Sequence, residues 1–213
     1  MYKTCNILGS TLNFFNSVQA GLKSRLFGFN PNTREYWNRK LSRFDGSWRS
    51  DHYELILDLL PEDTVFSLLD VGCALGDGCE LIKGTYPQSD ITGIDFSEVG
   101  IGEARRNNGQ VNFLIRDILN DPLSGKYDYI TIIQTLEHFD DPFMVVDKCL
   151  EHTRDSLIIS TPYNQSLALS LGEHRYRFDE YTFDRYNCHI AKLTDFSASL
   201  GYKCIVYQIK PVR

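Results

Sequence analysis

Short apolar runs alternate with amphipathic stretches along the chain from residue 64 onward. Apolar runs bounded by glycine, proline or acidic residues predict buried strands, and the amphipathic stretches between them predict helices. The segments that contain the predicted strands are 66–70, 91–97, 111–119, 127–142 and 155–163. Strands that alternate with helices in this way predict an α/β fold with a parallel sheet and right-handed crossovers.

A helical region is predicted to precede this alternating part. Apolar residues recur at helical spacing between 7 and 29, which predicts a helix with one hydrophobic face. That face could pack within the protein, form a homodimer or make peripheral contact with a membrane, and packing or dimer formation is the favoured interpretation. Asn30-Pro31-Asn32 ends this helix, and a second one is predicted over 33–44 with Thr33 as its cap.

These patterns divide the chain into two parts. Residues 1–49 are predicted to form an N-terminal helical cap, and residues 50–213 the main domain. The main domain is expected to open with an amphipathic helix over 50–63 and to close with a helix over 193–201 and a strand over 202–210. Residues 162–192 show little periodicity and are predicted to be a substrate-binding insertion. A second C-terminal strand, if there is one, is expected within 174–183.

A glycine-rich turn follows the first predicted strand. The strand ends in Asp70, and Gly72, Gly76 and Gly78 punctuate the turn that leads into a helix. Such a turn brings backbone N–H groups close to a ligand. The next strand ends in Asp95, and an acid about 20 residues past a glycine turn is placed to bind the hydroxyls of a ribose.

The glycine spacing separates two classes of cofactor. A dinucleotide site needs G-x-G-x-x-G, but Ala74 and Asp77 stand at the second and third glycine positions. The turn instead resembles the D-x-G-x-G-x-G motif of the class I S-adenosylmethionine-dependent methyltransferases, with Ala74 as its single departure. Segments 111–119, 127–142 and 155–163 resemble later elements of the same family, in the same order.

This resemblance implies a fold, a cofactor and a set of cofactor residues. The fold is a Rossmann-like three-layer sandwich with a mostly parallel sheet and an antiparallel C-terminal strand, and the cofactor is S-adenosylmethionine. Asp95 would bind the ribose hydroxyls and Asp117 would face the adenine amine. The residues assigned to the cofactor by the resemblance are Asp70, Gly72, Cys73, Ala74, Gly76, Asp95, Phe96, Asp117, Ile118 and Gln134.

His138 lies after the fourth predicted strand, where ligands of such sheets bind. The ordinary pKa of histidine suits a general base near neutral pH, so we predict His138 as the catalytic residue, with cofactor holding or helix capping as alternatives. The segment also resembles small-RNA 3′-end 2′-O-methyltransferases, in which E-x-x-E-H and a later histidine bind a divalent metal. Glu137, His138 and His174 match that set, but Gln134 replaces its first acid, and no metal is predicted.

Substrate contacts are predicted on two segments. Tyr36 and Trp37 lie in the cap helix, which in the family often covers the cofactor pocket, and core packing is the alternative for both. His174, Arg175 and Arg177 lie in the predicted insertion, where the two guanidinium groups would suit a phosphate, carboxylate or sugar. The alternative for these three residues is a solvated surface segment.

Composition and charge narrow the setting of the protein. The six cysteines include no C-x-x-C pair and Cys73 lies inside the glycine turn, so reduced thiols and a cytoplasmic location are predicted. No apolar run is long enough to cross a bilayer, and no secretory signal is predicted. Residues 1–50 are basic, whereas the whole chain carries a net charge of −6. Folding of this segment onto its own acidic body is favoured, so nucleic acid is not the predicted partner.

These features predict methyl transfer from S-adenosylmethionine to a hydroxyl or amine of a small molecule. A sugar or glycolipid precursor is the favoured acceptor, because the chain resembles short methyltransferases of glycan and natural-product pathways. Two alternatives remain open: an enzyme like the RNA 3′-end 2′-O-methyltransferases, and a non-catalytic subunit that binds S-adenosylmethionine.

Overall fold

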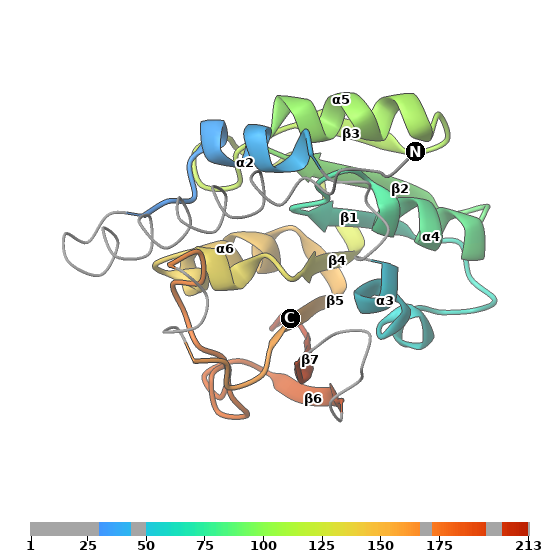
Figure 1. Ribbon diagram of the computed structural model, residues 1–213. Coiled ribbons are helices and arrows are strands. Elements are labelled where there is room, and N and C mark those ends of the chain that lie inside the picture. The colour runs from blue at the N-terminus through green and yellow to red at the C-terminus, as the bar shows by residue number, and fades with distance from the viewer. Residues whose placement is uncertain (1–29, 44–49, 167–171, 195–201, 213) are drawn as a thin grey trace, which may run out of the picture.

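The computed structural model describes residues 30–43, 50–166, 172–194 and 202–212. Within these ranges seven strands form one sheet in the order β3-β2-β1-β4-β5-β7-β6 (Figure 1). The strands are β1 (Ser67–Val71), β2 (Asp90–Asp95), β3 (Asn112–Ile115), β4 (Tyr127–Ile133), β5 (Thr153–Pro162), β6 (Cys188–Leu193) and β7 (Cys204–Ile209). The predicted helix over 7–29 lies outside the described residues.

The sheet is parallel from β3 to β5 and antiparallel at its C-terminal edge. β1 pairs in parallel with both β2 and β4, and β4 pairs in parallel with β5. β7 runs antiparallel to β5 and to β6. The mixed sheet and its flanking helices confirm the predicted Rossmann-like fold.

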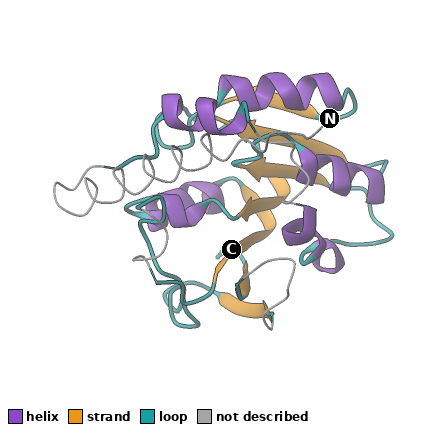
Figure 2. Cartoon of the chain, viewed as in Figure 1, coloured by secondary structure: helices purple, strands orange, loops and turns teal. Residues whose placement is uncertain are grey.

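Helices cover both faces of this sheet (Figure 2). The helices are α2 (Arg34–Leu41), α3 (Ser50–Glu54), α4 (Asp77–Thr85), α5 (Glu98–Asn107) and α6 (Pro142–Glu151), with short 3₁₀ turns η1 (Leu57–Leu59) and η2 (Leu136–His138). The predicted helix start at Thr33 is confirmed, since Thr33 caps α2, and Asp141 caps α6 ahead of Pro142. None of the described helices has the length and apolar character needed to cross a bilayer.

The alternation of side chains along the strands builds a separate core on each face. Leu68 of β1 packs in one core with residues of α3, α4 and α5. Its neighbours Leu69 and Val71 point the other way and pack with residues of α6 and of the segment before β6. Two cores with the sheet between them define the three layers.

The helix predicted over 50–63 is shorter in the structure. It breaks into α3 and η1, because Ile56 N–H donates to the Tyr53 carbonyl at 3.0 Å and Leu59 N–H donates to the Ile56 carbonyl at 3.1 Å. These i to i−3 bonds tighten the last turns, and they leave Tyr53, Ile56 and Leu60 buried against the sheet.

The second C-terminal strand is present, but it lies outside the range in which the sequence analysis expected it. It is β6, which lies beyond 174–183 and begins at Cys188. β6 is an edge strand with mostly exposed or half-buried side chains, so it carries no apolar run that would predict a strand. Leu193, the expected first residue of a helix, ends this strand instead, and 195–201 lies outside the described residues.

Candidate active site

The glycine turn after β1 is held against the ends of two other strands. The backbone N–H groups of Gly72 and Cys73 both donate to the Ile94 carbonyl, at 2.8 and 3.0 Å. Gly72 has a φ of +80°, and a Cβ on it would lie 2.5 Å from the side chain of Thr135 in the loop after β4. Only glycine therefore fits here, and the turn closes one side of a cavity beyond the carboxyl ends of the strands.

Ala74 fills the position at which the sequence departs from the family motif. Its φ of +50° is left-handed, a conformation that glycine adopts more easily. Its side chain is 3% exposed and packs with Trp37 and Leu41 of α2. The alanine thus contributes a methyl group to the contact between the turn and α2.

Asp95, at the end of β2, presents a carboxylate that the backbone holds in place. Oδ2 accepts a hydrogen bond from the N–H of Ala74 at 3.0 Å, and Oδ1 accepts one from the N–H of Ser97 at 2.8 Å. The residue lines the cavity. A carboxylate has about four acceptor positions, so each oxygen can accept a further hydrogen bond from a ligand hydroxyl.

Asp70 lies beneath the turn and does not line the cavity. It is fully buried, and its carboxylate accepts hydrogen bonds from the Tyr53 hydroxyl and the Thr131 hydroxyl, both at 2.7 Å. Burial raises the pKa of this carboxyl group above its usual value. Cys73 and Gly76 are also outside the cavity lining. Asp70, Cys73 and Gly76 were all predicted to contact the cofactor, but in the structure they belong to the strand end and the turn behind the cavity wall.

The other predicted cofactor residues do line the cavity. Asp117 uses its carboxylate to accept hydrogen bonds from the N–H of Leu119 at 3.0 Å and the side-chain amide of Asn120 at 2.8 Å. Gln134 has a φ of +50°, and its Oε1 accepts a hydrogen bond from the Tyr202 hydroxyl at 2.9 Å. Of the predicted residues, the cavity wall contains Gly72, Ala74, Asp95, Phe96, Asp117, Ile118, Gln134, His138 and Trp37.

Helix α2 forms a wall of the cavity, and Asn32 fastens it to the rest of the site. The indole N–H of Trp37 donates to Asn32 Oδ1 at 3.2 Å. The Asn32 amide then donates to the carbonyl of His138 at 3.2 Å and to that of Glu173 at 2.7 Å. Tyr36 is not part of the cavity lining, and its hydroxyl donates a hydrogen bond to the Glu173 carboxylate.

Sequence reasoning missed several of these residues. Asn30 and Asn32 both line the cavity, although their only evident sequence signal was that of a helix break. Leu41 also lines it. Its position inside a predicted helix carried no chemical signal, because its role depends on contacts with distant parts of the chain. Thr135 and Phe139 line the cavity as well, and both follow the fourth predicted strand, where ligands of such sheets bind.

His138 in η2 presents one ring nitrogen as an acceptor. Its Nδ1 lies 3.1 Å from the Glu173 carbonyl, and since a carbonyl oxygen can only accept, Nδ1 carries the proton. The lone pair is therefore on Nε2. The ring packs edge-on between Trp37 and His174, with centroid distances of 4.9 and 5.1 Å.

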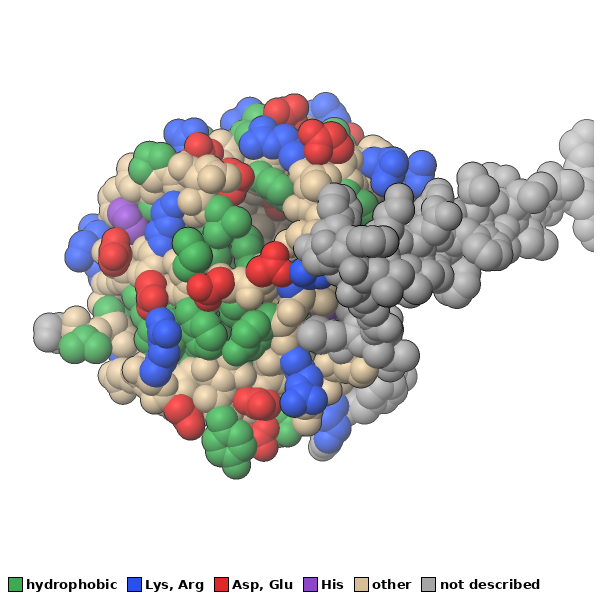
Figure 3. Space-filling view, turned by 90° about the vertical axis from the view of Figure 1, so that its left-hand side faces the viewer, with side chains coloured by type: hydrophobic (Ala, Val, Ile, Leu, Met, Phe, Trp, Pro, Cys, Tyr) green, Lys and Arg blue, Asp and Glu red, His purple; other side chains and the backbone are tan. Residues whose placement is uncertain are grey.

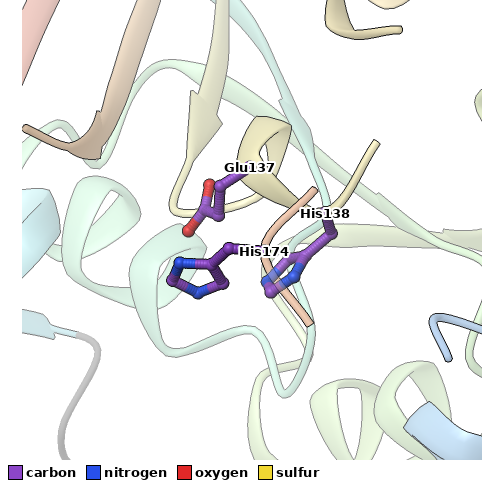
Figure 4. A group of neighbouring side chains, drawn as sticks. All are labelled: Glu137, His138 and His174. Atoms are coloured by element: carbon purple, nitrogen blue, oxygen red, sulfur yellow. The ribbon is translucent and has the colours of Figure 1, made fainter. Parts of the chain in front are cut away.

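His174, from the loop after β5, completes a group with Glu137 and His138 (Figure 4). The three side chains point toward one another, and one ligand atom from each lies within 4.8 Å of the other two. Burial lowers the pKa of His174 to about 4, with a further contribution from Lys40, so its ring is neutral at neutral pH. Glu137 is only 3% exposed.

The two predicted substrate arginines lie outside the cavity lining. Arg175 pairs with Asp140, with Nε to Oδ1 at 2.7 Å, and its backbone N–H donates to the Glu137 carbonyl at 2.6 Å. Arg177 is exposed.

Hydrophobic side chains gather between acidic and basic ones on the surface seen in Figure 3, the side on which α6 lies in Figure 1.

Comparison with known proteins identifies the class that this fold and site define. A family model described as a methyltransferase domain matches residues 33–197. The chain therefore belongs to this family, and it is a class I S-adenosylmethionine-dependent methyltransferase by family, as the sequence predicted. Its cofactor is accordingly S-adenosylmethionine.

Each of the curated relatives matches this chain over only part of its own length. The chain is 33% identical to the demethylmenaquinone methyltransferase of Thermotoga maritima over 129 residues, which is 59% of this chain and 54% of that protein. It is 28% identical to the malonyl-[acyl-carrier protein] O-methyltransferase of Bacillus anthracis, over 46% of this chain and 38% of that protein. The chain thus spans about half or less of the length of these curated relatives.

Solved structures resemble the whole fold. The plantazolicin methyltransferase BpumL, solved with S-adenosylhomocysteine, matches with a TM-score of 0.62 at 20% identity, covering 92% of this chain and 97% of that one. The magnesium protoporphyrin IX methyltransferase of Synechocystis matches with a TM-score of 0.65 at 20% identity, covering 83% and 97%. At this level of identity the likeness concerns the fold.

Proposed function

We propose that this protein transfers the methyl group of S-adenosylmethionine to a hydroxyl or amine of a small molecule. The observation that carries this proposal is a single cavity that has the glycine turn and Asp95 on one side and His138 on another. The first two would hold a nucleoside, and the histidine would stand where the reacting group arrives.

The cavity has residues suited to the ribose, the adenine and the methionine part of the cofactor. The Asp95 carboxylate, already oriented by two backbone N–H groups, would accept hydrogen bonds from both ribose hydroxyls. Phe96 and Ile118 would flank the adenine, and Asp117 would accept a hydrogen bond from its amine. Gly72 and Gln134 would lie along the methionine part, where the glycine lets the backbone come close.

The reaction needs alignment and removal of one proton. The acceptor oxygen or nitrogen attacks the methyl carbon in line, the carbon–sulfur bond breaks, and its electron pair remains on the sulfur of S-adenosylhomocysteine. Nε2 of His138 carries the lone pair that can receive the proton displaced from the acceptor. Trp37 and Leu41 of α2 would exclude water from this side of the cofactor.

The relatives support a small-molecule acceptor. Their names give demethylmenaquinone and a malonyl group on a carrier protein as methyl acceptors, and neither is a nucleic acid. A sugar or glycolipid precursor remains a prediction from the sequence, as do the contacts of Arg175 and Arg177 with the acceptor. The domain boundaries and the cytoplasmic location likewise remain predictions.

A crystal structure with S-adenosylhomocysteine tests the proposal. We expect the ribose hydroxyls within hydrogen-bond distance of Asp95 and the sulfur on the side of the cavity that His138 lines. A ligand bound elsewhere would contradict the cofactor assignment. A sulfur walled off from His138 would instead favour a subunit that binds the cofactor without transferring its methyl group.

A further inference from the structure

We propose that Glu137, His138 and His174 bind one divalent transition-metal ion, which holds the oxygen of the methyl acceptor. The metal site is inferred from these side chains alone, whereas the acceptor's place on the ion rests on the proposed function. Binding of the acceptor to the ion narrows the proposed acceptors to molecules with an oxygen nucleophile.

The geometry gathers three donor atoms from two segments. Glu137 and His138 are consecutive residues of η2, and His174 approaches from the loop after β5 (Figure 4). The candidate donor atoms lie within 4.8 Å of one another. Atoms that share one ion at metal distances of about 2.0–2.2 Å lie roughly 3–3.5 Å apart, so small side-chain rotations would complete the site.

Backbone contacts fix both segments in this arrangement. The N–H groups of Arg175 and Tyr176 both point at the Glu137 carbonyl, at 2.6 and 3.3 Å, and so bind the histidine loop to η2. The bond from Nδ1 of His138 to the Glu173 carbonyl directs Nε2 away from that loop backbone. Metal-binding histidines commonly use their second nitrogen in this way, which sets the tautomer and the ring orientation.

The donor set selects the kind of ion. Two imidazole nitrogens and one carboxylate oxygen suit Mn²⁺, Fe²⁺, Co²⁺ or Zn²⁺, whereas Ca²⁺ and Mg²⁺ prefer oxygen ligands throughout. Among the described residues, the thiol of Cys204 does not belong to this group of donor atoms. A cation also stabilises the charge of the Glu137 carboxylate, which is almost fully buried.

Three protein ligands leave positions open for an acceptor. His138 belongs both to this cluster and to the wall of the cofactor cavity, so an ion bound there would face the methyl group. A hydroxyl bound to the ion gives up its proton to water more readily, the oxygen attacks the methyl carbon, and the electron pair of the broken bond stays on sulfur. His138 then acts as a ligand of the ion in place of a proton acceptor.

Calorimetric titration of Mn²⁺ into the chelator-treated full chain tests the metal site. Mn²⁺ is a suitable probe because it favours oxygen and nitrogen over thiolate ligands. We expect one ion per chain, and at least about tenfold weaker binding in His174→Ala, because one of three ligands is lost. His189→Ala, which removes an exposed histidine on β6, is the matched control and should bind Mn²⁺ as the wild type does.

Binding of S-adenosylhomocysteine, measured on the same samples, separates the two proposals. His174 does not line the cofactor cavity, so His174→Ala should retain the wild-type affinity for this ligand, which also shows that the variant is folded. Absence of Mn²⁺ binding to the wild type, or equal binding to His174→Ala and His189→Ala, would overturn the metal site while leaving methyl transfer intact. Absence of S-adenosylhomocysteine binding to the wild type would instead contradict the proposed function.

Discussion

At the scale of the residue, backbone groups orient the side chains of the site. Asp95 and His138 are each held by a main-chain partner, at 2.8–3.1 Å. Both could be predicted from the sequence, because they follow strands whose carboxyl ends meet at one edge. Asn32 and the Glu173 carbonyl could not be predicted, because they meet across 141 residues of chain and neither belongs to a motif.

His174 makes the stability of the protein depend on pH. Its pKa is about 4 when folded and about 6.5 when unfolded, so the unfolded chain binds more protons between these values. The contribution of His174 to the free energy of unfolding should have its full value above pH 6.5 and should decline as the pH falls toward 4. At pH 5 this single group should account for up to about 2 kcal/mol of lost stability.

Urea unfolding at pH 7 and pH 5, in buffer with chelator, measures this effect. His174→Asn should lose less stability than the wild type between the two pH values, and His189→Asn, at an exposed position, should follow the wild type. If His174→Asn and the wild type lost stability equally, the ring would not be buried in its neutral form.

At the scale of the element, the helix α2 shows where sequence patterns suffice and where they fail. Its start at Thr33 was predictable from local capping chemistry, and the parallel strands were predictable from their apolar runs. The short α3 and the edge strand β6 were not predictable, because packing against the sheet and pairing with β7 decide them. Tyr36 was predicted to cover the pocket, yet only its neighbour Trp37 lines it.

Glu173 fastens α2 over the cavity, and its removal should loosen the helix. Its carboxylate accepts hydrogen bonds from the Tyr36 hydroxyl and from the Lys40 ammonium group, the latter at 2.5 Å between half-buried side chains. Loss of charged hydrogen bonds of this kind costs about 1.5–3 kcal/mol. Amide hydrogens of α2 should therefore exchange roughly 10- to 100-fold faster in Glu173→Ala, measured by hydrogen–deuterium exchange.

The control for this prediction lies on the same helix. Glu35 is exposed in the first turn of α2, where an acid stabilises a helix by only about 0.3–1 kcal/mol, so Glu35→Ala should speed exchange in α2 by no more than a few-fold. The Glu173→Ala variant keeps its backbone carbonyl and hence the bond to His138. Unchanged exchange in Glu173→Ala would mean that the apolar contacts of Trp37 and Leu41 hold α2 without the ionic link.

At the scale of the whole molecule, the site exists because the sheet brings distant segments to one edge. The strand order puts β1 between β2 and β4, so the glycine turn, Asp95 and η2 all meet beyond their carboxyl ends. The sequence predicted these three positions from the order of strands and motifs. The wall that α2 adds could not be placed, since no pattern states where a terminal helix docks.

Calorimetric titration of S-adenosylhomocysteine into three proteins tests the central claim, that Asp95 anchors the cofactor in this cavity. The wild type should bind one molecule per chain. Asp95→Asn removes the charge but keeps the size of the side chain, and should weaken binding by about 1.5–3 kcal/mol, roughly 10- to 100-fold. Asp90→Asn makes the same change at the exposed start of the same strand and should bind as the wild type does. Equal affinity in Asp95→Asn and Asp90→Asn would contradict the account.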